Sequence, residues 1–180
     1  MKKFWQKSLI VVVLSVLALS AVLLCSCNEY DNKNITLYND IGKYMNASFL
    51  EQNRTYGVRY SIDVYDDETD SWMTSSMTVK DAPSTRDFIV DTEEQFIHIF
   101  AERPIDINFE SEMLIIHMFT DTNNRPVKLK EIIFENNKME VYFIVQRRID
   151  GLNDTTEPGQ KCFAIKMKKT ELTTVTFIRK

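Results

Sequence analysis

Glycine and proline are scarce in this 180-residue sequence, which contains four of each. A phosphate-binding loop needs closely spaced glycines that let the backbone approach the phosphates, and no such run is present. No low-complexity segment and no repeat of fixed period is found. The sequence therefore excludes nucleotide binding by a glycine-rich loop and excludes a repeat architecture.

Cysteine is also scarce, with only Cys25, Cys27 and Cys162. Cys25 lies in the N-terminal signal segment described below and Cys27 at the lipidation site expected directly after it, which leaves Cys162 without a partner for an internal disulfide. Cys162 lies in an apolar stretch, which is more typical of a small buried residue than of a reactive thiol.

The sequence has two histidines, His98 and His117, and lacks an HExxH motif or a close His–Cys grouping. A hydrolase needs a nucleophile, a base and an orienting group together, and a zinc site needs a closed ligand set. We expect His98 to face solvent from a helix, and His117 to be a core or rim residue with a hydrogen-bond partner. No catalytic residue, metal ligand or cofactor site is therefore assigned, and we do not expect an enzyme.

The N-terminus has the pattern of an export signal. Lys2, Lys3 and Lys7 precede any acidic residue, and positions 9–24 are apolar except for two serines. A basic start followed by an apolar run and small residues is typical of a signal segment. The run of about 16 residues is shorter than the ~20 that span a bilayer core, so a retained transmembrane helix is less favoured.

Leu24-Cys25-Ser26-Cys27 resembles the lipobox of bacterial lipoproteins, in which a small residue precedes the cysteine that receives the lipid. Ser26 suits that position and Leu24 does not, so the resemblance predicts a signal peptide at residues 1–26 and lipidation of Cys27. Residues 27–35 are then a flexible tether. Its acidic residues resemble the export tags of surface lipoproteins in Bacteroidetes, which implies a cell-envelope location, at the outer membrane or cell surface if the cell is Gram-negative.

The remaining chain would be acidic. Loss of residues 1–26 removes three of the 22 basic residues and none of the 26 acidic ones, so the formal net charge changes from −4 to −7. Nucleic-acid binding rewards clustered lysine and arginine, so no nucleic-acid partner is expected. Lipid rather than charge would hold such a protein to an anionic membrane.

Hydrophobic periodicity predicts one globular domain over residues 36–180. Helical spacing occurs near 37–47, and at 92–103 with Thr92 as N-cap and an apolar face of Phe96, Ile97 and Phe100. Alternation predicts a half-buried strand at 57–64 that forms a hairpin with 72–79. Further strands are expected at 86–90, 113–119, 127–134 and 139–145, and 162–167 and 172–178 are expected to form a final hairpin. The fold class is α+β, mainly β: a largely antiparallel sheet or sandwich of six to eight strands with one or two short helices.

The C-terminal half, residues 86–178, resembles the PrcB C-terminal-like domain of small bacterial lipoproteins. The matching segments are FIVDTEEQFIHIF, IDINFESEMLIIHMF, VKLKEIIFENNKMEVYFIV and KCFAIKMKKTELTTVTF. The positions that carry the pattern are Phe96, Phe100, Ile107, Phe109, Met113, Leu114, Ile115, Ile132, Asn137, Val141, Ile165 and Phe177. Arg125-Pro126 departs from the Gly-Tyr pair often found there. The namesake stabilises a surface protease, so the resemblance implies a binding role and no catalytic residues.

Two polar loops allow alternative interpretations. The acidic loop Asp63–Asp70 has oxygen ligands of the kind Ca²⁺ prefers but lacks the glycine of an EF-hand loop, so a solvated hairpin tip is favoured. The loop with Asp150, Asn153, Asp154 and Glu157 is weighed in the same way. Within it, Asp154-Thr155-Thr156 fits the pattern of O-glycosylation in Bacteroidetes at Thr155, although a pattern so short also occurs by chance.

The sequence as a whole predicts a membrane-anchored lipoprotein of the cell envelope that acts as a non-enzymatic binding or assembly module with a protein partner. An inhibitor or immunity lipoprotein is the first alternative. A carboxylate-dependent hydrolase of envelope polymers is the second, although no pair of acids is singled out.

Overall fold

The structure is a computed structural model that describes residues 34–122, 125–146 and 157–180. The predicted signal peptide, Cys27 and most of the tether lie outside the described residues, as does Thr155. Nine strands form within them, named β1 (Thr36–Tyr38), β2 (Arg59–Asp66), β3 (Ser71–Thr78), β4 (Thr85–Val90), β5 (Glu112–Asp121), β6 (Val127–Glu135), β7 (Lys138–Val145), β8 (Gly159–Lys168) and β9 (Thr174–Arg179). The helices are η2 (Ile41–Tyr44, a 3₁₀ helix), α2 (Ala47–Gln52) and α3 (Glu93–Ile99).

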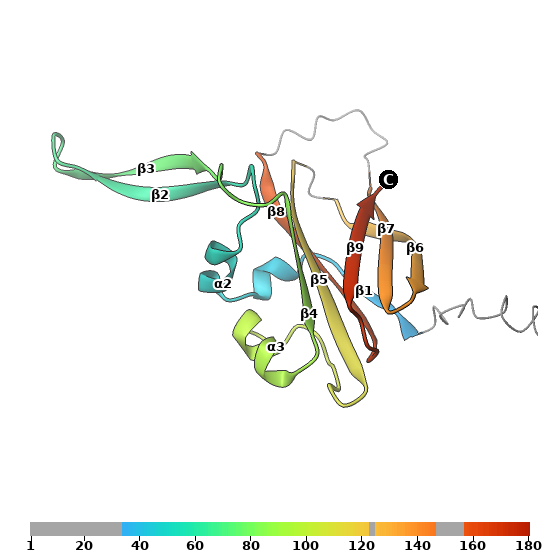
Figure 1. The fold of residues 1–180 in the computed structure, drawn as a ribbon. Coiled ribbons are helices and arrows are strands. Elements are labelled where there is room, and N and C mark those ends of the chain that lie inside the picture. The colour runs from blue at the N-terminus through green and yellow to red at the C-terminus, as the bar shows by residue number, and fades with distance from the viewer. Residues whose placement is uncertain (1–33, 123–124, 147–156) are drawn as a thin grey trace, which may run out of the picture.

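A four-stranded antiparallel sheet of order β1-β8-β5-β4 forms the middle layer of the body (Figure 1). Strands β5 and β8 pair along their full length, from Glu112 opposite Lys168 to Asp121 opposite Gly159. The apolar run predicted at 113–119 as a strand covered on both faces is buried throughout, so that prediction is confirmed.

Alternation along β5 supplies two separate cores. Leu114 and Ile116 point towards the helices, where they join the apolar side chains of η2, α2 and α3. Met113 and Ile115 point to the opposite face, where they join the side chains of β7 and β8. Successive side chains of a strand face opposite sides, so one apolar run packs both layers.

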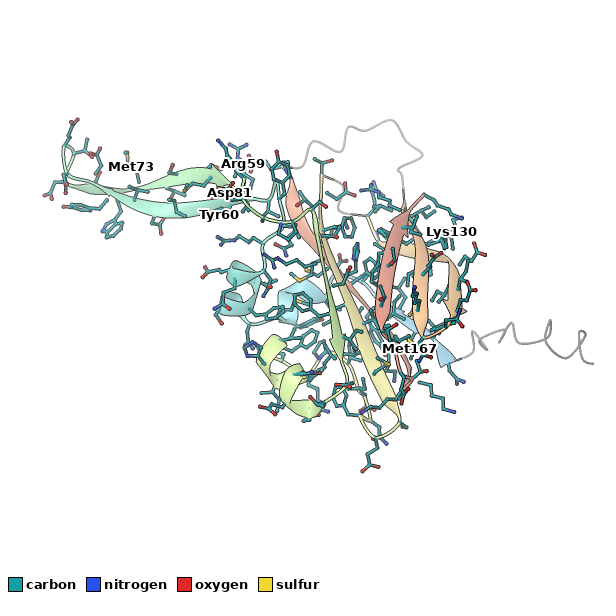
Figure 2. All side chains as sticks on the ribbon, viewed as in Figure 1. Arg59, Tyr60, Met73, Asp81, Lys130 and Met167 are labelled. Carbon is teal, nitrogen blue, oxygen red and sulfur yellow. The ribbon has the colours of Figure 1, made fainter. Side chains whose placement is uncertain are left out.

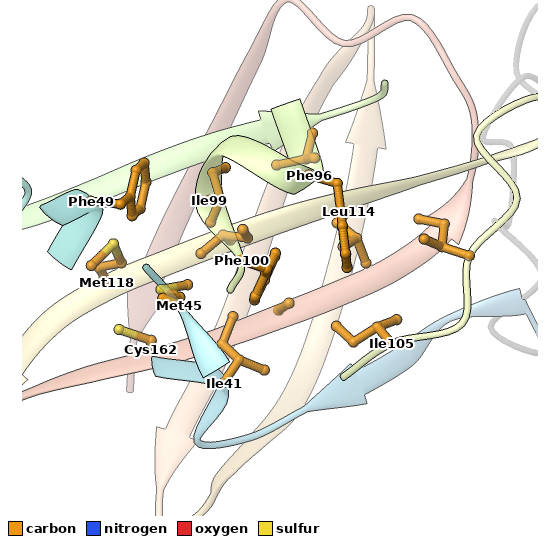
Figure 3. Packing of buried hydrophobic residues seen from close by; sticks show 14 residues of the cluster. Ile41, Met45, Phe49, Phe96, Ile99, Phe100, Ile105, Leu114, Met118 and Cys162 are labelled. Atoms are coloured by element: carbon orange, nitrogen blue, oxygen red, sulfur yellow. The ribbon is translucent and has the colours of Figure 1, made fainter. Parts of the chain in front are cut away.

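The helical layer is positioned by aromatic side chains. Phe96 and Phe100 have ring centroids 4.7 Å apart, and both belong to the core that Figure 3 shows between the helices and β5. Thr92 caps α3 as predicted, because its hydroxyl accepts a hydrogen bond from the backbone N–H of Gln95. Helix α3 is therefore docked through its C-terminal turn and capped at its other end.

A second sheet of order β6-β7-β9 covers the other face of the middle sheet. The turn between β6 and β7 is Asn136-Asn137, as predicted, and both residues have positive φ angles of 50° and 61°. Two successive residues with positive φ are typical of a type I′ hairpin turn, which asparagine tolerates well. Strand β9 runs parallel to β7, the one parallel pairing among the described strands.

Strands β2 and β3 form a two-stranded hairpin that extends away from the three layers (Figure 1). We call residues 59–78 the arm. The predicted hairpin with an acidic loop is confirmed. The expected half burial holds at the base, where Val58 is buried and Tyr60 and Ile62 are partly buried. It fails further out, since Val64 and every residue of β3 are exposed.

Three local predictions are also wrong. The segment 37–47 is not one helix, because Thr36–Tyr38 pairs with β8 as a strand and only the short η2 follows. Ile97 is 62% exposed, and Ile99 occupies the buried position between Phe96 and Phe100. Helix α3 ends at Ile99, four residues before the expected end, because Phe100 has an extended backbone and forms a bridge with Met45.

The hairpin predicted from 162–167 and 172–178 does not form, and this is the largest difference from the predicted fold. Strand β8 pairs with β1 and β5 in the middle sheet, whereas β9 pairs with β7 in the second sheet. The two strands are neighbours in sequence but lie in different layers. The fold class itself is confirmed as α+β and mainly β, with β1 as the strand in place of the expected helix.

Candidate interaction surface

The arm has one apolar face. Tyr60 lies opposite Met77 and Val64 lies opposite Met73, so these four side chains share one side of the hairpin with Ile62. The hydroxyl of Tyr60 is 4.0 Å from the sulfur of Met77. Figure 2 shows Met73 towards the tip of the arm and Tyr60 at its base.

The other face of the arm is mostly polar and internally hydrogen-bonded. The hydroxyl of Thr74 donates to the carboxylate of Asp63 at 3.0 Å, and Arg59 Nε donates to the hydroxyl of Ser76 at 2.7 Å. Towards the tip this face ends in Tyr65 and Trp72, whose rings are 5.3 Å apart and meet edge to face. Trp72 is 71% exposed. The arm is thus amphipathic, with an aromatic pair at its outer end.

The tip of the arm is acidic. Asp66 accepts hydrogen bonds from the hydroxyl of Thr69 and the backbone N–H of Glu68, and these two bonds lower the pKa of Asp66. The hydroxyl of Tyr65 donates to the carboxylate of Asp70, which raises the pKa of Tyr65. These contacts order the turn locally and explain it without a bound cation.

The base of the arm is anchored to the body by backbone and side-chain contacts. Backbone hydrogen bonds join Gly57 and Val58 to Val79, and Gly57 has a φ of 85°, a conformation that favours glycine. The guanidinium of Arg54 lies 3.7 Å above the ring centroid of Tyr60. Arg59 forms an ion pair of 2.9 Å with Glu157. The direction in which the arm leaves the body is therefore set by several contacts.

The predicted core histidine is a structural contact. His117 is 2% exposed, and its Nδ1 is 2.5 Å from a carboxylate oxygen of Asp87 on the neighbouring strand β4. Its ring stacks on Phe177 with centroids 4.2 Å apart and also contacts three other rings of the core between the sheets, those of Phe119, Phe143 and Phe163. The prediction of a buried histidine with a hydrogen-bond partner is confirmed.

His98 and Cys162 also lie where the sequence placed them. His98 is exposed on α3, with its ring edge-on to Phe49. Cys162 is buried in β8, and burial raises the pKa of its thiol to about 12. A thiol with such a pKa is almost entirely protonated at neutral pH, and the thiolate is the reactive form. Cys162 is therefore a packing residue.

An open cavity of about 400 Å³ lies beside Cys162, between η2, α2 and the start of β8. Three of its charged residues have partners: Arg54 contacts Glu51 and Tyr60, and Lys161 donates to the backbone carbonyl of Arg125 at 2.6 Å. Burial lowers the pKa of the Lys161 ammonium. Asp40 and Lys43 complete the charged lining of the cavity.

Residues 34–122, 125–146 and 157–180 contain neither a metal-binding cluster nor a membrane-spanning helix. No group of three or more His, Cys, Asp or Glu side chains in these ranges is placed to hold a metal ion. No helix in the same ranges has both the length and the apolar character needed to cross a membrane. Of the second polar loop only Glu157 is described, and it pairs with Arg59.

No family model, no curated protein and no solved structure matches this chain. The resemblance to the PrcB C-terminal-like domain therefore stays a prediction. The sequence predicts only part of the arm. The alternation at 57–64 indicates an apolar face, but it does not indicate whether another layer covers that face.

Proposed function

We propose that the protein is a lipid-anchored module of the cell envelope that binds another protein through the arm and does not act as an enzyme. The observation that carries the proposal is the apolar face of the arm, which has the alternation of a core strand and no core against it. Exposed apolar surface of this kind is typical of interaction sites.

Energetics support a binding role for the arm. An isolated two-stranded hairpin is marginally stable in water, and burial of an apolar face is what usually stabilises it. Val64 and Met73 are 43% and 52% exposed, so a partner that covers them would supply this burial. Exposed tryptophan and tyrosine side chains are also the residues that most often dominate binding energies at interfaces.

The anchor is proposed from the sequence alone. The lipobox-like Leu24-Cys25-Ser26-Cys27 supports lipidation of Cys27, and the polar residues that follow would separate the lipid from the domain. A lipid anchor holds the arm near one membrane, which favours partners that reside in the same envelope.

The test is site-specific photo-crosslinking in intact cells. We expect benzoylphenylalanine at position 73, on the apolar face of the arm, to yield one dominant covalent partner, and the same probe at position 97 to yield none. Ile97 is the matched control because it is an exposed apolar residue on α3, outside the arm. Equal crosslinking from the two positions would contradict the proposal for the arm. Fatty-acid labelling that persists in Cys27→Ala would contradict the proposed anchor.

A further inference from the structure

We infer that the arm is built for a protein partner whose binding surface is cationic and carries apolar side chains between its positive charges. This inference rests on the proposed function and specifies the chemistry of the partner. It depends on the charge of the arm in addition to its apolar face.

The arm beyond its first residue carries charge of one sign only. Residues 60–78 contain five acids and no lysine, arginine or histidine. Four of the acids, Asp66, Asp67, Glu68 and Asp70, lie in or beside the turn at the tip. Arg59, the only cation of the arm, lies at the base and is paired with Glu157. The four tip acids form no ion pair with a lysine or arginine of the described residues.

The negative charge of the arm and its apolar face together favour one class of binding partner over the others. An anionic lipid surface or a nucleic acid would be repelled by five carboxylates. A second copy of this chain would bring the same five charges and a net acidic body against them. A protein surface with lysine or arginine around an apolar centre satisfies both features, because the acids then steer association while the apolar face supplies buried area.

The acidic tip and the apolar face of the arm lie close together. The apolar pair Val64–Met73 lies next to the turn, only two positions from Asp66 along β2. The Tyr65–Trp72 pair is on the opposite face at the same level. The aliphatic pair and the aromatic pair therefore lie on opposite sides of the same end of the arm, both beside the tip acids. A partner that encloses this end changes the surroundings, and so the fluorescence, of Trp72.

The experiment uses the full chain in neutral detergent with Trp5→Phe, so that Trp72 is the only tryptophan. The probe is a synthetic ten-residue peptide that alternates arginine and valine. Two control peptides replace arginine by glutamate or valine by serine. We expect the arginine–valine peptide to change Trp72 fluorescence at the lowest concentration, with affinity that falls roughly tenfold between low and high salt.

Two matched variants distinguish the effect of the arm's charge on binding from the effect of the overall net charge. The arm variant carries Asp66→Asn, Asp67→Asn, Glu68→Gln and Asp70→Asn, and asparagine suits the positive φ of residue 70. The body variant neutralises four exposed acids elsewhere, at Glu94, Glu102, Glu110 and Glu135. We expect the arm variant to lose roughly tenfold or more in affinity for the arginine–valine peptide and the body variant to change less than about twofold. Thermal melts of both variants should match the parent, which excludes unfolding as the cause.

Several results would overturn the inference. Equal losses in the two variants would mean that overall charge, and not the arm, attracts the peptide. Equal binding of the serine-containing peptide would remove the apolar requirement. A crosslink from position 73 to a second copy of this chain would show self-association. Each of these results leaves the proposed function standing, because position 73 would still crosslink to a protein, whereas absence of crosslinks would contradict that function directly.

Discussion

Strand β5 and strand β2 have comparable apolar content but opposite surroundings. β5 is covered by helices on one face and by a sheet on the other, so seven of its ten residues are buried and none is exposed. β2 pairs only with β3 and leaves most of its residues in solvent. In β5 the apolar side chains hold the protein together, whereas in β2 they are available to another molecule. The two strands therefore predict opposite responses to the same kind of substitution.

The largest difference should come from removal of apolar volume. Phe163→Ala, in β8 against β5, should lower the free energy of unfolding by about 3–5 kcal/mol, because it leaves a cavity among packed rings. Val64→Ala in the arm should lower it by less than about 0.5 kcal/mol. Urea melts of the two single variants measure both values. A loss from Val64→Ala that equals the loss from Phe163→Ala would mean that the arm is packed in solution.

Carboxylates should show the same contrast on a smaller scale. Asp87→Ala removes the hydrogen-bond partner of buried His117 and should cost about 1–3 kcal/mol, because the imidazole nitrogen is left unsatisfied. Asp63→Ala removes an equally direct bond from Thr74 on the arm, and water can replace it, so the cost should be under about 0.5 kcal/mol. Chemical denaturation measures the free energy of unfolding of both variants. Equal losses would contradict the assignment of His117 as a structural residue.

The rate of methionine oxidation should differ between the arm and β5 in the unmodified, fully folded protein. Met73 and Met77 on the arm are about half exposed, whereas Met113 and Met118 in β5 are 2% exposed or less. Dilute hydrogen peroxide should oxidise the arm methionines roughly tenfold faster or more, since core methionines react only when the core opens. Peptide mass mapping over time measures the rates. Protection of Met73 and Met77 in cells, but not in the purified chain, would show that a partner covers them.

The parts of the fold that sequence predicts well are fixed by local physics. The Asn136-Asn137 turn follows from backbone conformations that asparagine tolerates, and the cap of α3 follows from the hydroxyl of Thr92. The buried run of β5 follows from the absence of any charged side chain between Met113 and Phe119. Each of these features depends on residues within a few positions of one another.

The failures have a common physical cause, which is dependence on distant segments. Strands adjacent in sequence usually pair, so 162–167 and 172–178 were expected to form a hairpin, but β8 finds better partners in β1 and β5. In the same way, alternation at 57–64 predicts an apolar face and contains no information on what lies against it. The candidate site is therefore the place where the alternation was correct and the expected burial holds only at the base of the arm.

The pairing of β1 with β8 affects how the chain reaches this structure. It joins Thr36 to Lys166, about 130 residues apart in the sequence. Strand β9 follows β8 in the sequence and pairs with β7 at the edge of the other sheet. Contacts between residues so far apart slow folding, because a long loop must close before the contacts stabilise it. The middle sheet cannot be completed until β8 has been synthesised, long after β1. Until then a nascent chain of this topology has β4 and β5 of that sheet but neither the strand that joins β5 to β1 nor the core that this strand covers.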